Sequence, residues 1–257
     1  MQKAFAKVNI FLKITGVRDG YHTLASRFMV VKDLYDEVDF FQKDKKEFVI
    51  DGKFDCDVEQ NTIYKAYKEL LAYAKDKTIE EFFETYGIRV IKNIPSFAGL
   101  GGGSSDSATF LKMTNERLKL GLSVEELSKI GARVGADVPF FIYGYKSANV
   151  RGIGEIVEKF EEDVLDIKTI TPKIAISTPL VYKKYRSDFF SPISKDEEKK
   201  FLELTSKEAL EKFDIYQAND LYKPALSLYP KLKTYQKDGW FFSGSGSSFF
   251  KINDIIS

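Results

Sequence analysis

The feature that most constrains this chain is a glycine-rich segment that leads directly into an amphipathic pattern. Residues 99–103 read Gly-Leu-Gly-Gly-Gly, and Ser104 and Ser105 follow them. Glycine permits positive φ and a close approach of the backbone, so several N–H groups can converge on one anion. The helix expected from about Ser105 to Lys119 adds unpaired N–H groups and the positive end of its dipole. The segment predicts a phosphate-binding loop, with a flexible glycine turn capped by serine as the simpler alternative.

This loop does not fit the common nucleotide-binding motifs. The chain lacks G-x-x-x-x-G-K-[ST], and the serines after Gly101-x-Gly103 prevent completion of G-x-G-x-x-G. It also lacks the H-R-D and D-F-G motifs of protein kinases. The glycine-rich segment therefore indicates a phosphate site of another class.

Hydrophobic periodicity predicts a mixture of strands and helices around this loop. Residues 4–15 alternate between apolar and polar positions, which predicts a half-buried strand with Lys7 and Asn9 on one face, followed by a turn at residues 18–20. A Ser-x-x-Glu capping box at Ser123 predicts a helix that stops near Gly135. Further strands are expected at residues 28–31, 37–41, 48–50, 88–91, 173–177, 240–242 and 249–252, and further helices at 62–75 and from 195.

Composition limits the classes of protein to which the chain can belong. It has 257 residues, of which 44% are hydrophobic, and 39 Lys and Arg residues nearly balance 38 Asp and Glu residues. A formal charge of +1 gives no long-range field that favours nucleic acid or an anionic membrane. The single cysteine, Cys56, suits a reducing compartment, and Lys3, Lys7 and Lys13 interrupt the apolar residues that an export signal needs. We therefore expect a cytoplasmic protein that binds neither nucleic acid nor membrane.

The length suggests one large or two medium domains. Gly152 and Gly154 predict a turn, and we place a domain boundary there, between residues 1–155 and residues 156–257.

Four motifs in one order resemble those of the GHMP small-molecule kinases. They are Ala6-Lys7-Val8-Asn9-Ile10-Phe11-Leu12 with Asp19-Gly20-Tyr21-His22, Pro95-x-x-x-Gly99-Leu100-Gly101-Gly102-Gly103-Ser104-Ser105, Gly135-Ala136-Asp137-Val138-Pro139, and Ser243-Gly244-Ser245-Gly246-Ser247-Ser248. The first motif has a shorter turn than is common in the family. The last of the four, Ser243 to Ser248, resembles what is called the third motif of the family, and it has serine at its first and sixth positions. The combination of Gly-Tyr-His with Gly-Ala-Asp-Val-Pro is unlike the family branches that act on mevalonate or homoserine.

The resemblance implies an α+β, two-domain GHMP kinase fold, with a ribosomal-S5-like N-terminal domain that binds ATP and a ferredoxin-like C-terminal domain. It implies a kinase that uses ATP and Mg²⁺ to phosphorylate the 2-hydroxyl of 4-diphosphocytidyl-2-C-methyl-D-erythritol, in the non-mevalonate synthesis of isoprenoid precursors. Two alternatives stay open: a GHMP kinase that acts on another alcohol, and a non-catalytic ligand-binding module on the same scaffold. Intact Lys7 and Asp137 argue against the second.

The resemblance also assigns the catalytic residues. It implies that Asp137 accepts the proton of the reacting hydroxyl, that Lys7 faces both groups, and that Asn9 lies near the substrate. A carboxylate base suits a poorly acidic alcohol, and a neighbouring ammonium keeps that carboxylate ionised. From the residues alone, Asp137 would be a turn aspartate, and Lys7 and Asn9 would lie on a solvated strand face.

The remaining site residues follow from the same resemblance. For the substrate, it places the rings of Tyr21 and Tyr182 on either side of the cytosine, His22 on the cytosine, and Thr178 and Gly244 nearby. Considered alone, His22 would be a structural histidine and each tyrosine a packing residue. The residues implied for ATP are Asn61 and Ile63 near adenine, and Pro95, Gly99, Leu100, Gly101, Gly102, Gly103, Ser104 and Ser105 at the phosphates. The metal ligands are not predicted.

Overall fold

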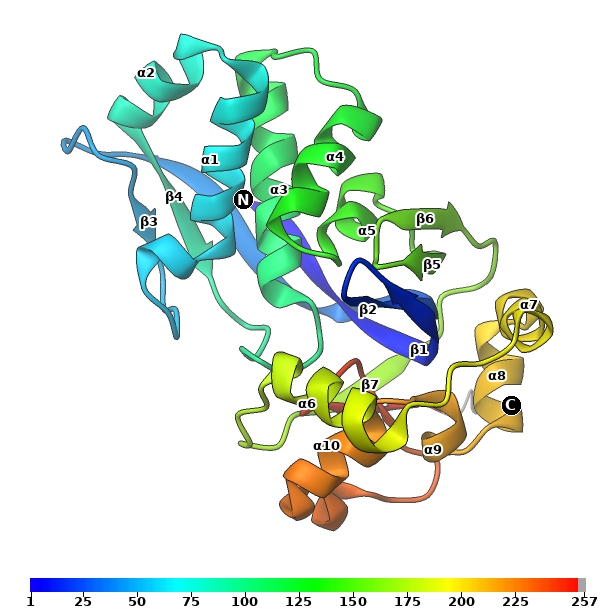
Figure 1. Cartoon of the computed structure of the whole chain (residues 1–257). Coiled ribbons are helices and arrows are strands. Elements are labelled where there is room, and N and C mark those ends of the chain that lie inside the picture. The colour runs from blue at the N-terminus through cyan, green and yellow to red at the C-terminus, as the bar shows by residue number, and fades with distance from the viewer. Residues whose placement is uncertain (254–257) are drawn as a thin grey trace. The chain divides into compact units, whose positions relative to one another are not determined.

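The computed structural model describes residues 1–253, which group into two compact units (Figure 1). The first unit comprises Met1–Ala6, Asp33–Ser96 and Gly101–Gly144, and the second comprises Lys7–Lys32, Phe97–Leu100 and the chain from Tyr145 onward. Two long strands, β1 (Gln2–Arg18) and β2 (Tyr21–Gln42), contribute residues to both units. The domain boundary near residue 155 stays a prediction.

Strands β1 and β2 pair with each other and are joined by the expected turn. Asp19 and Gly20 occupy this turn with φ of 51° and 83°. Strand β1 is not half-buried as predicted, because every residue from Ala6 to Ile14 is buried, including Lys7 and Asn9. Its polar face is therefore enclosed, and the solvated-face alternative is wrong.

Strand β2 replaces two strands expected at residues 28–31 and 37–41. The polar residues between them do not end the strand, because successive parts of β2 have different partners. Its Leu24–Met29 part pairs antiparallel with β5 (Ser147–Gly152), and its Glu37–Gln42 part pairs antiparallel with β4 (Tyr86–Ile91). Pairing along its length keeps the backbone extended where the side-chain pattern lapses.

The first unit combines a β3-β4-β2 sheet with packed helices. Strand β3 runs parallel to β4, and the helices α1, α3, α4 and α5 pack on one another (Figure 1). Phe83 and Phe110 are fully buried in its core, with ring centroids 5.6 Å apart. The remaining elements of this unit are β3 (Ile50–Asp51), η1 (Val58–Gln60), α1 (Thr62–Ala74), α2 (Lys77–Thr85), α3 (Gly102–Leu118), α4 (Val124–Val134) and α5 (Val138–Tyr143).

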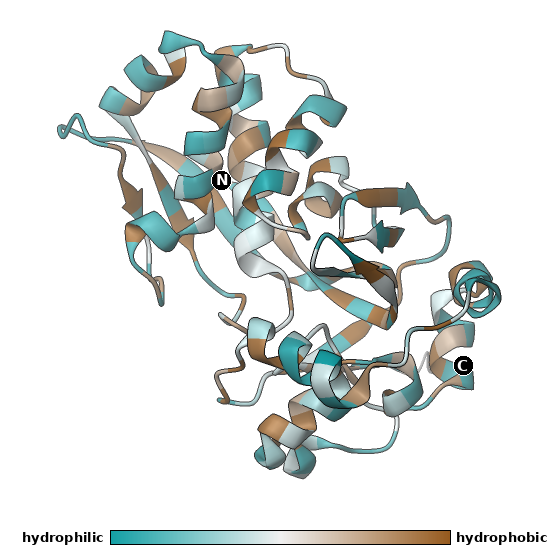
Figure 2. Cartoon of the chain, in the orientation of Figure 1, coloured by the Kyte–Doolittle hydropathy of each residue, from teal (hydrophilic) through white to brown (hydrophobic). Residues whose placement is uncertain are grey.

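Local sequence signals account for most of these helices. Helix α1 occupies the predicted range and buries one apolar stripe, and the bands of Figure 2 show hydrophilic and hydrophobic residues alternating along it. The side chain of Ser123 accepts from the N–H of Glu126, and the carboxylate of Glu126 accepts from the N–H of Ser123. Helix α4 therefore starts at the predicted capping box, and it ends before Gly135 as expected.

Two helix boundaries differ from the prediction. Helix α3 begins at Gly102, inside the glycine run, because Gly101 turns the chain with φ of 72° and the helix continues from there. Asp137 lies in a turn as expected, but Val138 begins α5 although the following proline biases it away from helix. Pro139 occupies the first turn of that helix, where the missing N–H of proline has no intrahelical partner to lose.

The second unit contains the β2-β5-β6 strands and a separate three-stranded sheet. Strands β5 and β6 form a hairpin across the predicted turn at residues 152–154, and the other sheet has the order β7-β9-β8. Phe242 and Phe249 are buried with ring centroids 5.2 Å apart. The remaining elements are β6 (Ile156–Lys159), β7 (Ile167–Ile170), α6 (Thr178–Lys184), η2 (Tyr185–Phe189), α7 (Lys195–Glu203), α8 (Ser206–Lys212), α9 (Ile215–Ala218), α10 (Tyr222–Leu228), η3 (Pro230–Tyr235), β8 (Phe241–Phe242) and β9 (Phe249–Ile252).

The strand predicted at residues 173–177 is wrong. The strand of this region is β7, which ends at Ile170 and pairs antiparallel with β9. The next residues alternate in hydropathy, but no partner strand extends the pairing to them. The predicted positions of α7 and β9 are confirmed. Within residues 1–253, no helix has both the length and the apolar character needed to cross a membrane.

Candidate active site

Lys7 and Asn9 form a buried polar pair on β1. Their side chains are on the same face, as alternation predicts, and the ammonium of Lys7 donates to Asn9 Oδ1 over 2.6 Å. The Asn9 amide donates to Ser26 Oγ at 2.9 Å, and Ser26 donates to the carbonyl of Phe11. The Lys7 Nζ also lies 4.2 Å from the centroid of the Phe28 ring. These contacts fix the two polar side chains in a defined orientation.

A turn formed by Ser243–Ser248, hereafter the third-motif turn, lies against this pair. Ser243 Oγ accepts from the backbone N–H of Asn9 at 3.3 Å and donates to the carbonyl of Gly99 at 2.8 Å. Gly99 lies so close to this turn that an added Cβ would be 2.2 Å from the carbonyl oxygen of Ser243. A Cβ on Gly244 would lie 3.4 Å from Asn9 Oδ1. The second unit thus joins parts of three sequence motifs, and glycine permits their contact.

The rest of the glycine-rich segment forms the start of α3 in the first unit. No side chain caps this helix at Gly101, which leaves its first N–H groups available to an anion. The hydroxyl of Thr62 donates to the carbonyl of Gly103 at 2.7 Å, and the side chain of Asn61 caps α1 by accepting from the N–H of Ile63. The expected adenine and phosphate residues are therefore linked through the adjacent starts of α1 and α3.

A buried ionic cluster of Asp36, Lys92 and Asp106 supports the base of this loop. Lys92 Nζ donates to Asp36, and to Asp106 at 2.7 Å. Asp36 also accepts from the backbone N–H groups of Asn93 and Ile94, at 2.5 and 2.8 Å. Burial raises the pKa of Asp106 to about 7, although the Lys92 charge opposes this shift. The cluster ties the end of β4 to the first turns of α3.

Asp137 lies at the N-terminus of α5 in the first unit. It is only partly buried, and its side chain does not cap the helix. The carboxylate is therefore not used to satisfy the start of α5. Asp137 and Lys7 belong to different units, so their approach to each other stays a prediction.

His22 belongs to an aromatic cluster of the second unit. Its ring centroid lies 5.3 Å from that of Tyr182, 5.6 Å from that of Tyr185 and 6.3 Å from that of Phe190. Burial lowers the pKa of His22, and the charge of Arg186 lowers it further, so the imidazole is held neutral near pH 7. The Nε2 atom is buried and has no hydrogen-bond partner among the described residues.

The expected substrate residues near this cluster differ in exposure. Tyr21 is 67% exposed, whereas Tyr182 is partly buried. The Thr178 and Ser245 hydroxyls lie 2.6 Å apart, so the start of α6 contacts the third-motif turn. The structure therefore brings Tyr182 to His22, and Thr178 to the residue after Gly244.

The expected site residues divide between the two units. The first unit holds Asn61, Ile63, Pro95, Gly101, Gly102, Gly103, Ser104, Ser105 and Asp137. The second unit holds Lys7, Asn9, Tyr21, His22, Gly99, Leu100, Thr178, Tyr182 and Gly244.

Several residues that hold these side chains in place were not predicted from the sequence. Tyr185 follows Tyr182 by three residues, a helical spacing that could have suggested a second ring on the same face. Ser26, Asp36 and Lys92 carry no comparable signal, because their partners are distant in the sequence.

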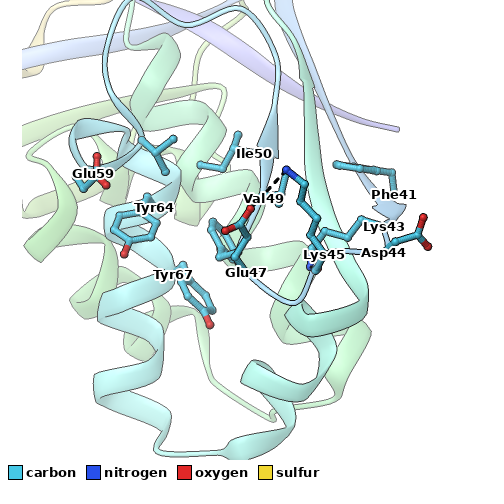
Figure 3. A pocket seen from close by; sticks show the side chains of 12 residues that line it. Phe41, Lys43, Asp44, Lys45, Glu47, Val49, Ile50, Glu59, Tyr64 and Tyr67 are labelled. Atoms are coloured by element: carbon cyan, nitrogen blue, oxygen red, sulfur yellow. Dashed lines mark hydrogen bonds and ion pairs between the residues drawn. The ribbon is translucent and has the colours of Figure 1, made fainter.

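A cavity of about 990 Å³ opens elsewhere in the first unit (Figure 3). Tyr64 and Tyr67 line it from α1, and the segment around Lys45 and Glu47 lines it from the other side. Val58 and Glu59 bring its edge close in sequence to Asn61, but none of the residues expected to bind ATP lines it. We do not assign the nucleotide to this cavity.

Comparison with known proteins identifies relatives along the whole chain. Residues 61–145 match the family model described as the GHMP kinases N terminal domain. The chain is 54% identical to a protein of Sulfurimonas denitrificans named 4-diphosphocytidyl-2-C-methyl-D-erythritol kinase, covering 99% of this chain and 97% of that protein. It is 44% identical to a Campylobacter jejuni protein of the same name, covering 98% and 99% of the two chains.

Solved structures agree with this similarity. A crystal structure of 4-(cytidine 5'-diphospho)-2C-methyl-D-erythritol kinase superposes with a TM-score of 0.71 and 29% identity, over 98% of this chain and 90% of that chain. A mevalonate kinase superposes with a TM-score of 0.64 over the same shares of the two chains, at 16% identity. The second likeness concerns the fold alone, and both agree with the expected α+β GHMP kinase fold.

Proposed function

Because the chain belongs to the family of 4-diphosphocytidyl-2-C-methyl-D-erythritol kinases, we propose that it transfers the γ-phosphoryl group of ATP to the 2-hydroxyl of that substrate. The products are ADP and the 2-phosphate, formed in the non-mevalonate synthesis of isoprenoid precursors. The observation that carries the proposal is full-length similarity at 54% identity, and the buried pair of Lys7 and Asn9 agrees with it.

The glycine-rich segment is the proposed binding site of the ATP phosphates. The uncapped start of α3 offers backbone N–H groups and the positive end of a 17-residue helix. The hydroxyls of Ser104 and Ser105 suit phosphate oxygens or a phosphate-bound Mg²⁺, whose preferred ligands are oxygen atoms. Mg²⁺ neutralises phosphate charge when it is bound. The proposed Mg²⁺ arrives with the nucleotide, as is usual for this ion at phosphoryl-transfer sites. Pro95, Gly99, Leu100, Asn61 and Ile63 complete the proposed ATP site.

Lys7 and Asp137 are the proposed catalytic residues. The substrate 2-hydroxyl oxygen forms a bond with the γ-phosphorus, its proton passes to the Asp137 carboxylate, and the bond from the γ-phosphorus to the bridging oxygen breaks toward ADP. The Lys7 ammonium stabilises negative charge on the attacking oxygen. Asn9 orients Lys7 through their 2.6 Å hydrogen bond.

We propose that the aromatic cluster around His22 recognises the cytosine. Tyr182 offers a ring for stacking, with Tyr21 as the second ring, and the neutral imidazole of His22 offers a hydrogen-bonding edge. Thr178 and Gly244 lie at the adjoining turn contact and complete the proposed substrate residues. We further propose that residues 1–155 form the ATP-binding domain, and that the protein is cytoplasmic and binds no nucleic acid.

The direct test is transfer of phosphate from ATP to the cytidylated substrate by the purified protein. We expect efficient transfer to this compound and very poor transfer to methylerythritol 4-phosphate, which lacks the cytidine. Equal or better use of that truncated compound, mevalonate or homoserine would refute the substrate assignment.

Asp137→Asn tests the proposed base. This variant should lose roughly 10²–10⁴-fold in kcat while it still binds ATP, because the amide cannot accept the proton. Asp163→Asn, at an exposed position, is the matched control and should leave kcat unchanged. A rate within a few-fold of the parent in the Asp137 variant would remove that residue from the chemistry.

A further inference from the structure

Asn219 is hydrogen-bonded to the start of the third-motif turn. The residue is 2% exposed, and its amide nitrogen donates to the carbonyls of Phe242 and Gly244, each at 2.9 Å. Its amide oxygen accepts from the N–H of Leu221 at 2.8 Å. Every polar atom of the side chain therefore has a partner, and two of these partners lie in or beside the turn.

The segment that carries Asn219 is itself anchored on β1. Asn219 forms an isolated parallel bridge with Leu12, and the N–H of Asp220 donates to the Leu12 carbonyl at 3.0 Å. The Asp220 carboxylate accepts from the N–H of Ile14 at 2.8 Å and from the ammonium of Lys13. The segment is thus bound to the strand that carries Lys7 and Asn9.

These contacts connect the third-motif turn to β1 in two ways. Two adjacent residues at the start of the turn carry them: Ser243 accepts from the N–H of Asn9 on β1, and Gly244 accepts from Asn219, which is tied to β1 at Leu12. Because a peptide unit is planar, fixing the carbonyl of Gly244 also fixes the direction of the N–H of Ser245. The turn is therefore held in register with β1 at two points.

We propose that Asn219 and Asp220 are positioning residues of the reaction, which hold the third-motif turn in register with Lys7 and Asn9. This inference rests on the proposed function for its kinetic consequence, although the contacts themselves do not. Asn219 aligns the turn, and Asp220 anchors Asn219 to the strand. Small displacements of groups around a reacting centre cost about tenfold to a hundredfold in rate.

The test compares Asn219→Ala with Asn149→Ala. The control residue Asn149 also donates its amide to a backbone carbonyl, that of Leu202 at 3.1 Å, and its amide oxygen accepts from Arg27. Neither of these partners lies on β1 or in the third-motif turn. Both variants should lose stability. Only Asn219→Ala should lower kcat by about tenfold or more with saturating ATP and cytidylated substrate. Its KM for ATP should stay within about threefold of the parent, because the hydrogen bonds of the Asn219 side chain go to Phe242, Gly244 and Leu221, none of which is expected to bind ATP.

Hydrogen exchange supplies a readout that does not depend on activity. Amides of residues 243–248 should exchange faster in Asn219→Ala than in the parent, and at the parental rate in Asn149→Ala. Unchanged exchange at the turn, or an equal loss of kcat in the two variants, would overturn the proposal. An inactive parent protein would refute the proposed function instead, and the exchange comparison would then decide the positioning of the turn by itself.

Discussion

Replacing Gly99 by alanine tests whether the glycine-rich segment must pass directly against the third-motif turn. Gly99 has φ of 73°, and an added Cβ would lie 2.2 Å from the backbone oxygen of Ser243 and 3.1 Å from two backbone atoms of Gly246. The left-handed conformation costs an alanine about 1–2 kcal/mol. The overlap with backbone adds about 1–3 kcal/mol, the usual cost of overpacking. Gly99→Ala should therefore lower the free energy of unfolding by about 2–5 kcal/mol.

Gly121→Ala is the matched control. Gly121 has a similar φ of 70°, but among residues 1–253 no atom outside its immediate neighbours lies within 4 Å of an added Cβ. This variant should show only the conformational cost of about 1–2 kcal/mol. The difference between the two variants therefore isolates the collision with the third-motif turn.

Urea unfolding followed by circular dichroism measures this difference, and steady-state kinetics measures its consequence. Relief of the overlap requires movement of Ser243, which accepts from the N–H of Asn9, so Gly99→Ala should also lose kcat while Gly121→Ala should not. Equal destabilisation by the two variants, with equal kcat, would refute the close approach of the two turns.

Two other predictions concern the aromatic cluster and the buried ionic cluster. Tyr182→Ala should raise the KM for the cytidylated substrate by about tenfold or more, since base stacking contributes about 1–3 kcal/mol, while Tyr182→Phe keeps the ring and should stay near the parent. An unchanged KM in the alanine variant would exclude stacking on this ring. The pKa of Asp106 is raised to about 7, so the folded state retains a proton that the unfolded state releases at its ordinary pKa near 4. The free energy of unfolding of the parent should therefore fall as pH rises from about 4 to about 7, and Asp106→Asn, which cannot titrate, should lack this component. Urea titrations at several pH values measure both proteins, and identical pH profiles would contradict the assignment of this proton to Asp106.

Short-range sequence signals predicted much of the secondary structure. The capping box at Ser123 and the apolar stripe of α1 placed those helices, because each depends on residues within a few positions of one another. They failed at α5, because a proline disfavours helix at the residue before it, and yet Val138 begins this helix. They also failed at β2, whose length depends on which strands pair with it.

The sequence also indicated the residues of the candidate site. Glycine, serine, lysine and aspartate at motif positions indicated a phosphate site, and resemblance supplied their expected roles. The sequence could not indicate that Lys7 and Asn9 are buried, because alternation predicts which side chains share a face and not what covers that face.

Only the tertiary structure revealed the partners that hold those residues. The bond between Asn9 and Ser243 joins positions 234 residues apart, and the amide of Asn219 reaches a carbonyl 25 residues away. Local patterns arise from the geometry of one strand or helix, whereas these contacts arise where separate segments pack together. The sequence by itself thus determined the chemistry available to this protein. The tertiary structure decided which polar side chains hold the motif residues in place, because buried polar groups need hydrogen-bond partners inside a packed core.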